Sequence, residues 1–166
     1  MSLAPAPTNH DAVLHESLRA VVPSLQRCCS DDWCIIGSAA ARLIGADVVA
    51  ADIDVLCTRR DAAALMAHWQ PWRDHGHALA DGKRFRSHFA RFKLAAMPVE
   101  IMGDLELCMD GAWRHVQVER MVERGVDGMR VPIPDLAGQI RLLESFDRAK
   151  DHQRAQLLRR LSDRGV

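Results

Sequence analysis

The sequence predicts a single domain of the α+β (α/β) class, in which a mixed β-sheet is flanked by helices and further helices follow at the C-terminal end. Apolar residues at helical spacing dominate both ends of the chain, and short apolar or alternating runs typical of strands lie between them. Hydrophobic residues make up 48% of the 166 residues, which is typical of a folded protein with a sizeable core.

The first seventy residues are expected to alternate between helices and strands. Pro5 and Pro7 lie within residues 1–10, which we expect to form a flexible arm ahead of a domain that spans 11–166. The helix that follows carries one apolar stripe, formed by Leu14, Leu18, Val21, Val22 and Leu25. A strand, a helix, a second strand and a second helix come next, at 33–37, 38–44, 52–58 and 60–69. The first three of these are candidates for a βαβ-like unit, in a sheet that need not be wholly parallel.

The rest of the chain is expected to form a strand pair and then helices. A loop, two alternating segments that predict a hairpin, and two weaker strand patterns follow in order, at 70–82, 84–95, 98–104, 111–121 and 128–133. From Pro134 the apolar spacing becomes helical, which predicts a helical part over 134–163. The residues expected to face inward are Leu136, Ile140, Leu143, Phe146, Ala155, Leu158 and Leu161.

Composition excludes several classes of function. Lys+Arg and Asp+Glu both number 22, so the formal net charge is zero, and no overall electrostatic field favours binding to nucleic acid or to a membrane surface. The five cysteines are odd in number and lack a C-x-x-C spacing, so they predict reduced thiols in a cytoplasmic protein rather than a disulfide framework or a zinc site. The N-terminal segment lacks the basic region and the apolar run of a signal peptide, and no apolar run in the sequence is long enough to span a membrane.

Two carboxylates one residue apart stand inside an apolar strand. Because strand side chains alternate between faces, Asp52 and Asp54 are expected to point the same way. Adjacent buried carboxylates repel each other, and a divalent cation neutralises such a pair. Glu100 is the only acid in the apolar run 97–102, and it is the candidate third ligand on a neighbouring strand. Mg²⁺ prefers oxygen ligands of this kind; the alternative interpretation of the D-x-D pattern is a solvated strand face.

A glycine and a serine lie where the first strand meets the next helix. A helix N-terminus offers free N–H groups and a partial positive charge, so Gly37 and Ser38 are candidates for a phosphate seat. Glycine permits close approach of a phosphate to the backbone, and the serine hydroxyl adds a donor. The alternative is a helix start without a ligand. Together, the phosphate seat and the carboxylates favour a triphosphate that is held at one end by Gly37 and Ser38 and bridged by metal to the carboxylates at the other.

These motifs resemble the signature of the nucleotidyltransferase superfamily, which has the DNA polymerase β-like fold. Gly37-Ser38 is followed by an Ala-rich helix and, 14 positions after the serine, by Asp52-Ile53-Asp54, and Glu100 stands where the family carries a third acid. The segment "FDRAKDHQRAQLL" is similar to a helix region of its small bacterial members, which include minimal, AbiEii-like, lincosamide and aminoglycoside nucleotidyltransferases. The resemblance covers most of residues 33–158.

The resemblance implies transfer of an NMP, with AMP the favoured group, from an NTP to a hydroxyl acceptor, with release of pyrophosphate. It implies Asp52, Asp54 and Glu100 as the catalytic residues and as ligands of two Mg²⁺ ions, with Glu100 as ligand or general base. It implies an ATP-binding or other nucleotide-binding site that includes Gly37 and Ser38. Further candidates for that site are two basic residues, Arg42 and Lys150, although Lys150 and its neighbour Arg148 would also fit as surface charges. The acceptor is a small molecule, an RNA end or a protein.

The sequence also departs from the family in ways that leave a second hypothesis open. Relatives carry Thr two residues before the first aspartate, where this chain has Ala50, and a second acid near the C-terminus, where it has Arg154. The alternative is therefore a catalytically degenerate member that binds a protein partner, as in toxin–antitoxin pairs. A homodimer is a further possibility, because 166 residues leave little room for a separate acceptor domain.

Two other segments allow more than one interpretation. His75 and His77 form an H-x-H pattern, which predicts a solvated cluster, a transition-metal site or the border of an acceptor site. Basic and aromatic residues alternate over 82–93, which predicts a strand with aromatic residues in the core or a surface for single-stranded nucleic acid. Within a nucleotidyltransferase, Arg84 or Arg86 of this segment would contact phosphate or acceptor.

Overall fold

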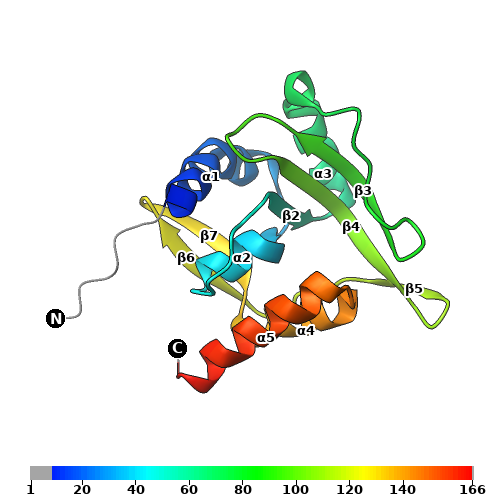
Figure 1. The fold of residues 1–166 in the computed structure, drawn as a ribbon. Coiled ribbons are helices and arrows are strands. Elements are labelled where there is room, and N and C mark those ends of the chain that lie inside the picture. Colours follow the sequence, from blue (N-terminus) through cyan, green and yellow to red (C-terminus); the bar gives the residue numbers. More distant parts are fainter. Residues whose placement is uncertain (1–8, 166) are drawn as a thin grey trace.

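The computed structural model describes residues 9–165, which form a mixed α+β fold, and residues 1–8 of the expected arm lie outside the described part (Figure 1). The helices are α1 (Asn9–Cys28), α2 (Gly37–Leu43), α3 (Arg59–His68), α4 (Leu136–Phe146) and α5 (Ala149–Asp163), with a 3₁₀ turn at Gln70–Trp72. The strands are β1 (Cys34–Ile36), β2 (Ile53–Cys57), β3 (Phe85–Phe92), β4 (Val99–Met109), β5 (Ala112–His115), β6 (Met121–Val126) and β7 (Met129–Pro134). The helix α1 begins at Asn9, two residues before the expected start of the domain at residue 11.

The main sheet is mixed, as the sequence predicts. Its order is β1-β2-β4-β3, with β5 paired to β4, and β6 and β7 form a separate hairpin. β2 and β4 are parallel, whereas β1 with β2 and β3 with β4 are antiparallel. The expected βαβ-like unit is therefore not a parallel one: α2 leads away from the end of β1, and residues 44–52 lead back to the same end of the sheet, where Ile36 lies opposite Asp54.

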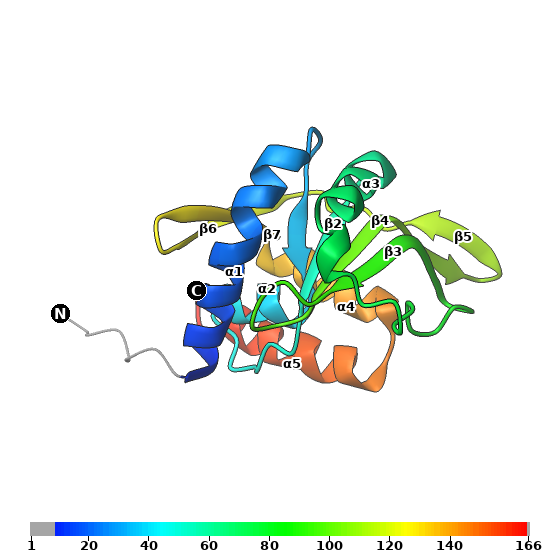
Figure 2. The same cartoon turned by 90° about the horizontal axis from the view of Figure 1, so that it is seen from above.

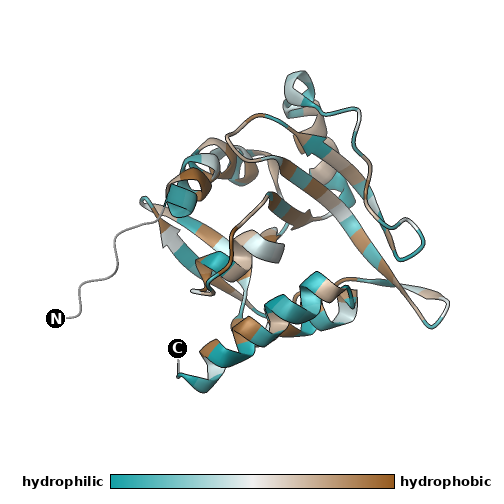
Figure 3. Cartoon of the chain, viewed as in Figure 1, coloured by the Kyte–Doolittle hydropathy of each residue, from teal (hydrophilic) through white to brown (hydrophobic). Residues whose placement is uncertain are grey.

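Helices cover both faces of the sheet, but unequally. α1 and α3 lie on one face and α4 and α5 on the other (Figures 1 and 2). The first face is a continuous core, in which Leu18 of α1 and Leu65 of α3 pack with Ile53, Val55 and Ile101 of the central strands. Apolar residues are frequent along the central strands, and hydrophilic residues predominate along α5 (Figure 3). The α4 helix buries Leu142 and Phe146 against only part of the second face, so the remainder of that face is free to form a site.

A β-bulge gives the second face a polar end and an apolar end. The pairing of β3 with β4 shifts between Arg86 and His88, and Asp104 of β4 has a left-handed backbone with φ of 47°. Ahead of the shift Glu100 and Met102 point to the second face, and after it Leu105 joins the same apolar cluster as Met102. Because of the bulge, the carboxylate of Glu100 and the apolar side chains of Met102 and Leu105 lie on the same face of β4.

No helix within residues 9–165 is long and apolar enough to cross a membrane.

Candidate functional site

The structure brings the three predicted carboxylates together on the second face of the sheet. Asp52 stands immediately before β2, Asp54 lies within it, and Asp54 is the register partner of Glu100 on the parallel strand β4. One carboxylate oxygen from each residue lies within 4.8 Å of the others. The alternation of side chains along β2 accounts for the first two, and the pairing of β2 with β4 adds the third.

Burial and mutual repulsion perturb these carboxylates. The pKa of Asp54 is raised well above its ordinary value by burial first, and then by the charges of Asp52 and Glu100 and a hydrogen bond with Glu100. The pKa of Asp52 is raised by burial and by Glu100, against the opposing effects of Arg91 and basic residues of α5. The cluster therefore carries more negative charge than its surroundings stabilise. An oxygen-only donor set with this excess of charge fits a hard divalent cation such as Mg²⁺.

Gly37 is required by the carboxylate beside it. Its backbone has φ of +70°, and a Cβ atom placed on it would lie 2.5 Å from Oδ2 of Asp54. The sequence suggested that this glycine admits a phosphate; the structure shows that it also makes room for Asp54. Ser38 is buried, and its Oγ accepts a hydrogen bond of 3.4 Å from the backbone N–H of Ala51, just ahead of Asp52. The start of α2 is thus tied to both aspartates.

Arg91 and His77 contact Glu100, a contact that was not predicted from the sequence for either residue. Arg91 is the antiparallel partner of Glu100 on β3, and its Nη1 lies 2.5 Å from Oε1 of Glu100 and 3.9 Å from Oδ2 of Asp52. His77 Nε2 lies 3.3 Å from the same Glu100 oxygen. The signal for Arg91 was present in the predicted hairpin, because a correct register would have placed it opposite Glu100.

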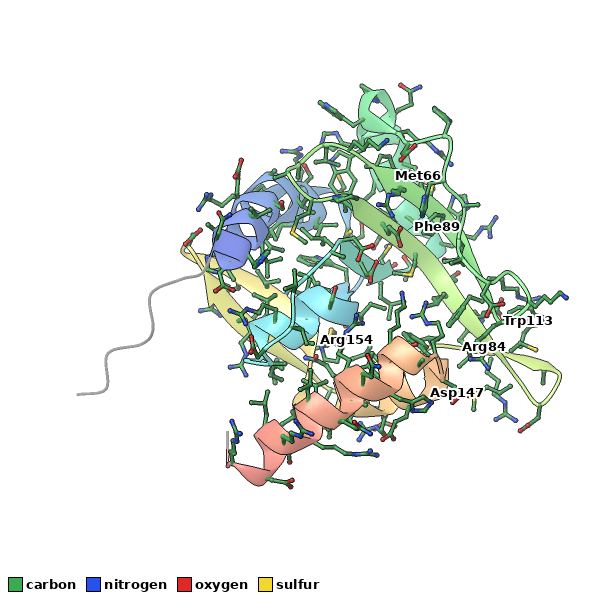
Figure 4. All side chains as sticks on the ribbon, viewed as in Figure 1. Met66, Arg84, Phe89, Trp113, Asp147 and Arg154 are labelled. Atoms are coloured by element: carbon green, nitrogen blue, oxygen red, sulfur yellow. The ribbon has the colours of Figure 1, made fainter. Side chains whose placement is uncertain are left out.

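Two arginines that the sequence favoured on this strand lie elsewhere. Arg84 donates a 2.7 Å hydrogen bond to the carbonyl oxygen of Phe146, and Arg86 binds Glu106 and lies over the ring of Trp113. Neither lines the cavity at the carboxylates, and Figure 4 shows Arg84 and Trp113 toward the β5 end of the sheet. Their contact with phosphate or acceptor therefore stays a prediction, and Arg91 is the arginine of β3 that lines this cavity.

Arg42 also lies away from the carboxylates. Its Nε and Nη2 donate hydrogen bonds of 2.6 Å and 2.8 Å to the two carboxylate oxygens of Asp11, and Nη1 lies 3.3 Å from Asp47. This ion pair fastens α2 to α1, and Arg42 does not line the cavity. The contacts point to a structural role, so we leave Arg42 out of the nucleotide site proposed below.

Basic residues of α5 complete the charged part of the site. Lys150 and Arg154 are four residues apart, so they share one face of the helix, and both line the cavity. Arg154 lies on the side of α5 that faces α2 (Figure 4). Its charge and that of Lys150 oppose the upward shift in the pKa of Asp52. Where the family pattern expects a second acid, this chain thus brings a further cation to the carboxylates.

The cavity at this site has a volume of about 310 Å³ and two unlike ends. Gly37, Ser38, the carboxylates, Arg91 and the basic residues of α5 line the charged end. Apolar side chains line the other end, namely Leu79, Phe85, Met102, Leu105 and Phe146, which form or pack against one apolar cluster. Ile36 and Leu143 also line the cavity, and Ile36 lies beside the charged end, opposite Asp54. His77 borders the cavity, as one interpretation of the H-x-H pattern anticipated, whereas His75 is exposed and not among the lining residues.

Comparison with known proteins identifies the fold. No protein-family model and no curated protein matches the sequence. A proposed nucleotidyltransferase of Thermotoga maritima, TM1012, matches 89% of this chain over 92% of its own, with a TM-score of 0.64 and 22% identity. This chain has the nucleotidyltransferase fold. The antibiotic-resistance factor ANT(2'')-Ia matches 89% of the chain over 83% of its own, with a TM-score of 0.58 and 14% identity.

A third solved structure agrees with this assignment. It is an antigenic nucleotidyltransferase-like protein of Paracoccidioides brasiliensis, which matches 90% of this chain over 77% of its own, with a TM-score of 0.56 and 14% identity. The three structures thus each match about nine tenths of this chain.

Proposed function

We propose that the protein is a Mg²⁺-dependent nucleotidyltransferase that moves an NMP, with AMP as the favoured group, from an NTP to a hydroxyl acceptor. The observation that carries this proposal is the meeting of three carboxylates within 4.8 Å beside the start of α2. Structural ion-pair networks also hold carboxylates together, but among residues 9–165 no cation forms an ion pair with Asp54, and only the more distant charge of Arg154 opposes the effect of its burial. The fold shared with nucleotidyltransferases supports the same conclusion.

Each end of the triphosphate has candidate partners. Gly37 and Ser38 would hold the β- and γ-phosphates at the start of α2, and Lys150 and Arg154 would oppose their charge from α5. Asp52, Asp54 and Glu100 would hold Mg²⁺, which on binding neutralises phosphate charge and polarises the α-phosphate. Positioning and charge neutralisation supply most of the rate in such transfers.

The transfer itself needs one base. The acceptor oxygen attacks the α-phosphorus, the new O–P bond forms as the bond from phosphorus to the β-phosphate oxygen breaks, and pyrophosphate leaves with the electron pair. Glu100 would take the hydroxyl proton, because it is the carboxylate closest to β3 and to His77, on the side away from the start of α2. Arg91 forms an ion pair with that carboxylate and would compete with the metal ion for it.

Binding of Mg·NTP tests the proposal without knowledge of the acceptor. Calorimetry with Mg²⁺ and each of the four NTPs should give a Kd for the wild type that Asp52→Asn and Asp54→Asn each weaken at least about tenfold. Asp110→Asn is the matched control, because it makes the same exchange in the exposed turn between β4 and β5. Binding that is equal in all four proteins would refute the proposal, and the NTP bound most tightly shows whether AMP is the transferred group.

A second candidate is a nucleotidyltransferase-fold protein that binds a protein partner, of the toxin–antitoxin type, without catalysis. It is favoured by the Arg91 guanidinium, which already neutralises Glu100, and by Ala50 in place of the family's threonine. In that case Mg·NTP would not bind, and a stoichiometric partner would co-purify with the chain. The same calorimetric experiment therefore separates the two candidates, and light scattering of the purified chain tests for the homodimer.

A further inference from the structure

The apolar end of the cavity is continuous with the position of the acceptor. Across the sheet the proposed groups follow in order from the start of α2 beside β1, through Asp54 on β2 and Glu100 on β4, to Arg91 on β3. A triphosphate at the start of α2 leaves the far side of Glu100 for the acceptor. From there the bulge of β4 continues the cavity over Met102 and Leu105.

Arg148 closes the apolar end with a flat cationic surface. Its guanidinium carbon lies 5.1 Å from the ring centre of Phe85 and 5.8 Å from that of Phe146, and these rings pack edge to face at 5.3 Å. Asp151, whose side chain is fully buried, holds the guanidinium through contacts of 2.5 Å to Nε and 3.1 Å to Nη2. About a third of the Arg148 side chain remains exposed, and it lines the cavity. A guanidinium fixed in this way stacks well on a further planar group.

The charges of the cavity do not suit a polycation. Four carboxylates line it, and three of these are the proposed metal ligands, Asp52, Asp54 and Glu100. The fourth, Asp151, is buried in its ion pair with Arg148. Among the described lining residues no carboxylate remains for an ammonium group of an acceptor, whereas four cations line the same cavity, Arg91, Arg148, Lys150 and Arg154.

We propose that the acceptor is an uncharged hydroxyl compound with a flat ring, which stacks on the Arg148 guanidinium while its chain lies over Met102 and Leu105 and its hydroxyl reaches Glu100. This inference rests on the proposed nucleotidyltransferase function. Phe85 and Arg91 are six positions apart along β3, which corresponds to about 20 Å, so an acceptor that reaches from Arg148 to Glu100 is elongated. The cavity of about 310 Å³ includes the charged end assigned to the triphosphate, so the space left for the acceptor suits a small molecule.

Three simple probes test the charge and the ring separately. We would titrate 2-phenylethanol, glycerol and an aminoglycoside into the full-length protein with Mg²⁺ and the non-cleavable analogue α,β-methylene-ATP, and follow the arginine Nε–H signals by NMR. We expect 2-phenylethanol to bind and to shift the Arg148 signal, and glycerol, which has no ring, to bind at least about fivefold more weakly. Tighter binding of the polycationic aminoglycoside would overturn the proposal.

A matched pair of variants locates the ring. Arg148→Lys keeps the charge but removes the plane, and should weaken 2-phenylethanol about five- to tenfold. Arg86→Lys is the control, because Arg86 also lies over an aromatic ring and binds a carboxylate but does not line the cavity. Phe85→Leu removes the ring behind the guanidinium and should act in the same direction, which keeps the test decisive if Arg148→Lys does not fold. Equal binding in all these variants would refute the stacking.

The remaining question is whether the ring on Arg148 belongs to the acceptor or to the nucleobase. Mg·ATP and Mg·tripolyphosphate, which has no base, distinguish the two sources. If the acceptor stacks there, Arg148→Lys leaves unchanged the ratio of the Kd for Mg·ATP to the Kd for Mg·tripolyphosphate. If that ratio rises, the base stacks there and the acceptor proposal is wrong. Loss of the proposed function would appear differently, as Mg·ATP binding that is absent or insensitive to Asp54→Asn while 2-phenylethanol still shifts Arg148.

Discussion

Replacing Gly37 with alanine should damage the carboxylate cluster more than the fold. The new Cβ would stand 2.5 Å from Oδ2 of Asp54, and real Cβ atoms essentially never approach closer than 3.0 Å, so the carboxylate has to move by at least 0.5 Å. An alanine at φ of +70° costs about 1–2 kcal/mol of folding stability in addition. For a protein of this size that is about 2–8 °C in Tm. A displacement of this order in a binding constellation should weaken Mg·ATP about tenfold or more.

The control for this substitution is Gly111→Ala. Gly111 has a similar φ of +76°, but nothing lies within 4 Å of the Cβ that it would gain. Differential scanning calorimetry should therefore show similar losses of stability for both variants, while isothermal titration with Mg·ATP should show weaker binding for Gly37→Ala alone. If both variants bind Mg·ATP as the wild type does, the contact between residue 37 and Asp54 does not govern the site, and the reasoning is refuted.

Three further predictions concern the ionic cluster and the core. Asp54→Asn should stabilise the metal-free protein by about 1–3 kcal/mol near neutral pH. The pKa of Asp54 is raised in the folded protein, so the free energy of unfolding falls as the pH rises through that raised pKa. Chemical denaturation at several pH values measures the gain, which should be absent below the ordinary pKa of 3.8. Arg91→Gln should tighten Mg²⁺ binding about three- to tenfold by calorimetry, because it frees Glu100 and removes a cation. Ser17→Ala should cost about 1–3 kcal/mol in urea unfolding, because it leaves the buried N–H of Met97 without its acceptor at 3.0 Å.

Each of these predictions has an outcome that contradicts it. A destabilised Asp54→Asn protein at neutral pH, without Mg²⁺, would show that the carboxylate is better stabilised than its burial indicates. Weaker Mg²⁺ binding by Arg91→Gln would mean that Arg91 positions Glu100 rather than competes for it. For Ser17, the control is Ser145→Ala, which removes only a hydrogen bond within α4, from Oγ to the carbonyl oxygen of Leu142, and a loss as large as that of Ser17→Ala would contradict the argument.

Local patterns carried much of the fold. The stripe of α1 is buried as its spacing predicts, from Leu14 to Leu25, and the strand and helix patterns up to residue 69 correspond to β1, α2, β2 and α3. The predicted hairpin over 84–104 is the pair β3 and β4. These patterns did not predict the relative direction of paired strands, because a short apolar strand has the same pattern in parallel and antiparallel pairs. The pair β1 and β2 is antiparallel.

The roles of the arginines could not be assigned from the sequence. Arg84, Arg86 and Arg91 have the same chemistry and lie on β3 or directly before it, and only the register of β3 against β4 determines that Arg91 meets Glu100. Arg42 follows Ser38 by one helical turn, yet it turns to Asp11, 31 positions earlier in the chain. Side chains this long reach several partners, so their place depends on which elements pack beside them.

The sequence by itself determined the chemistry of this protein's candidate site. Alternation along one strand fixed Asp52 and Asp54 on a common face, and the apolar setting of Glu100 marked it as their companion. Tertiary structure alone decided what surrounds that cluster. The pairing of strands brought Arg91, the bulge near Asp104 turned the face of β4 apolar, and the packing of α4 and α5 against it placed Arg148 and Arg154 at the cavity. The physical reason is that backbone periodicity is local, whereas register, bulges and helix packing follow from contacts between residues far apart in the chain.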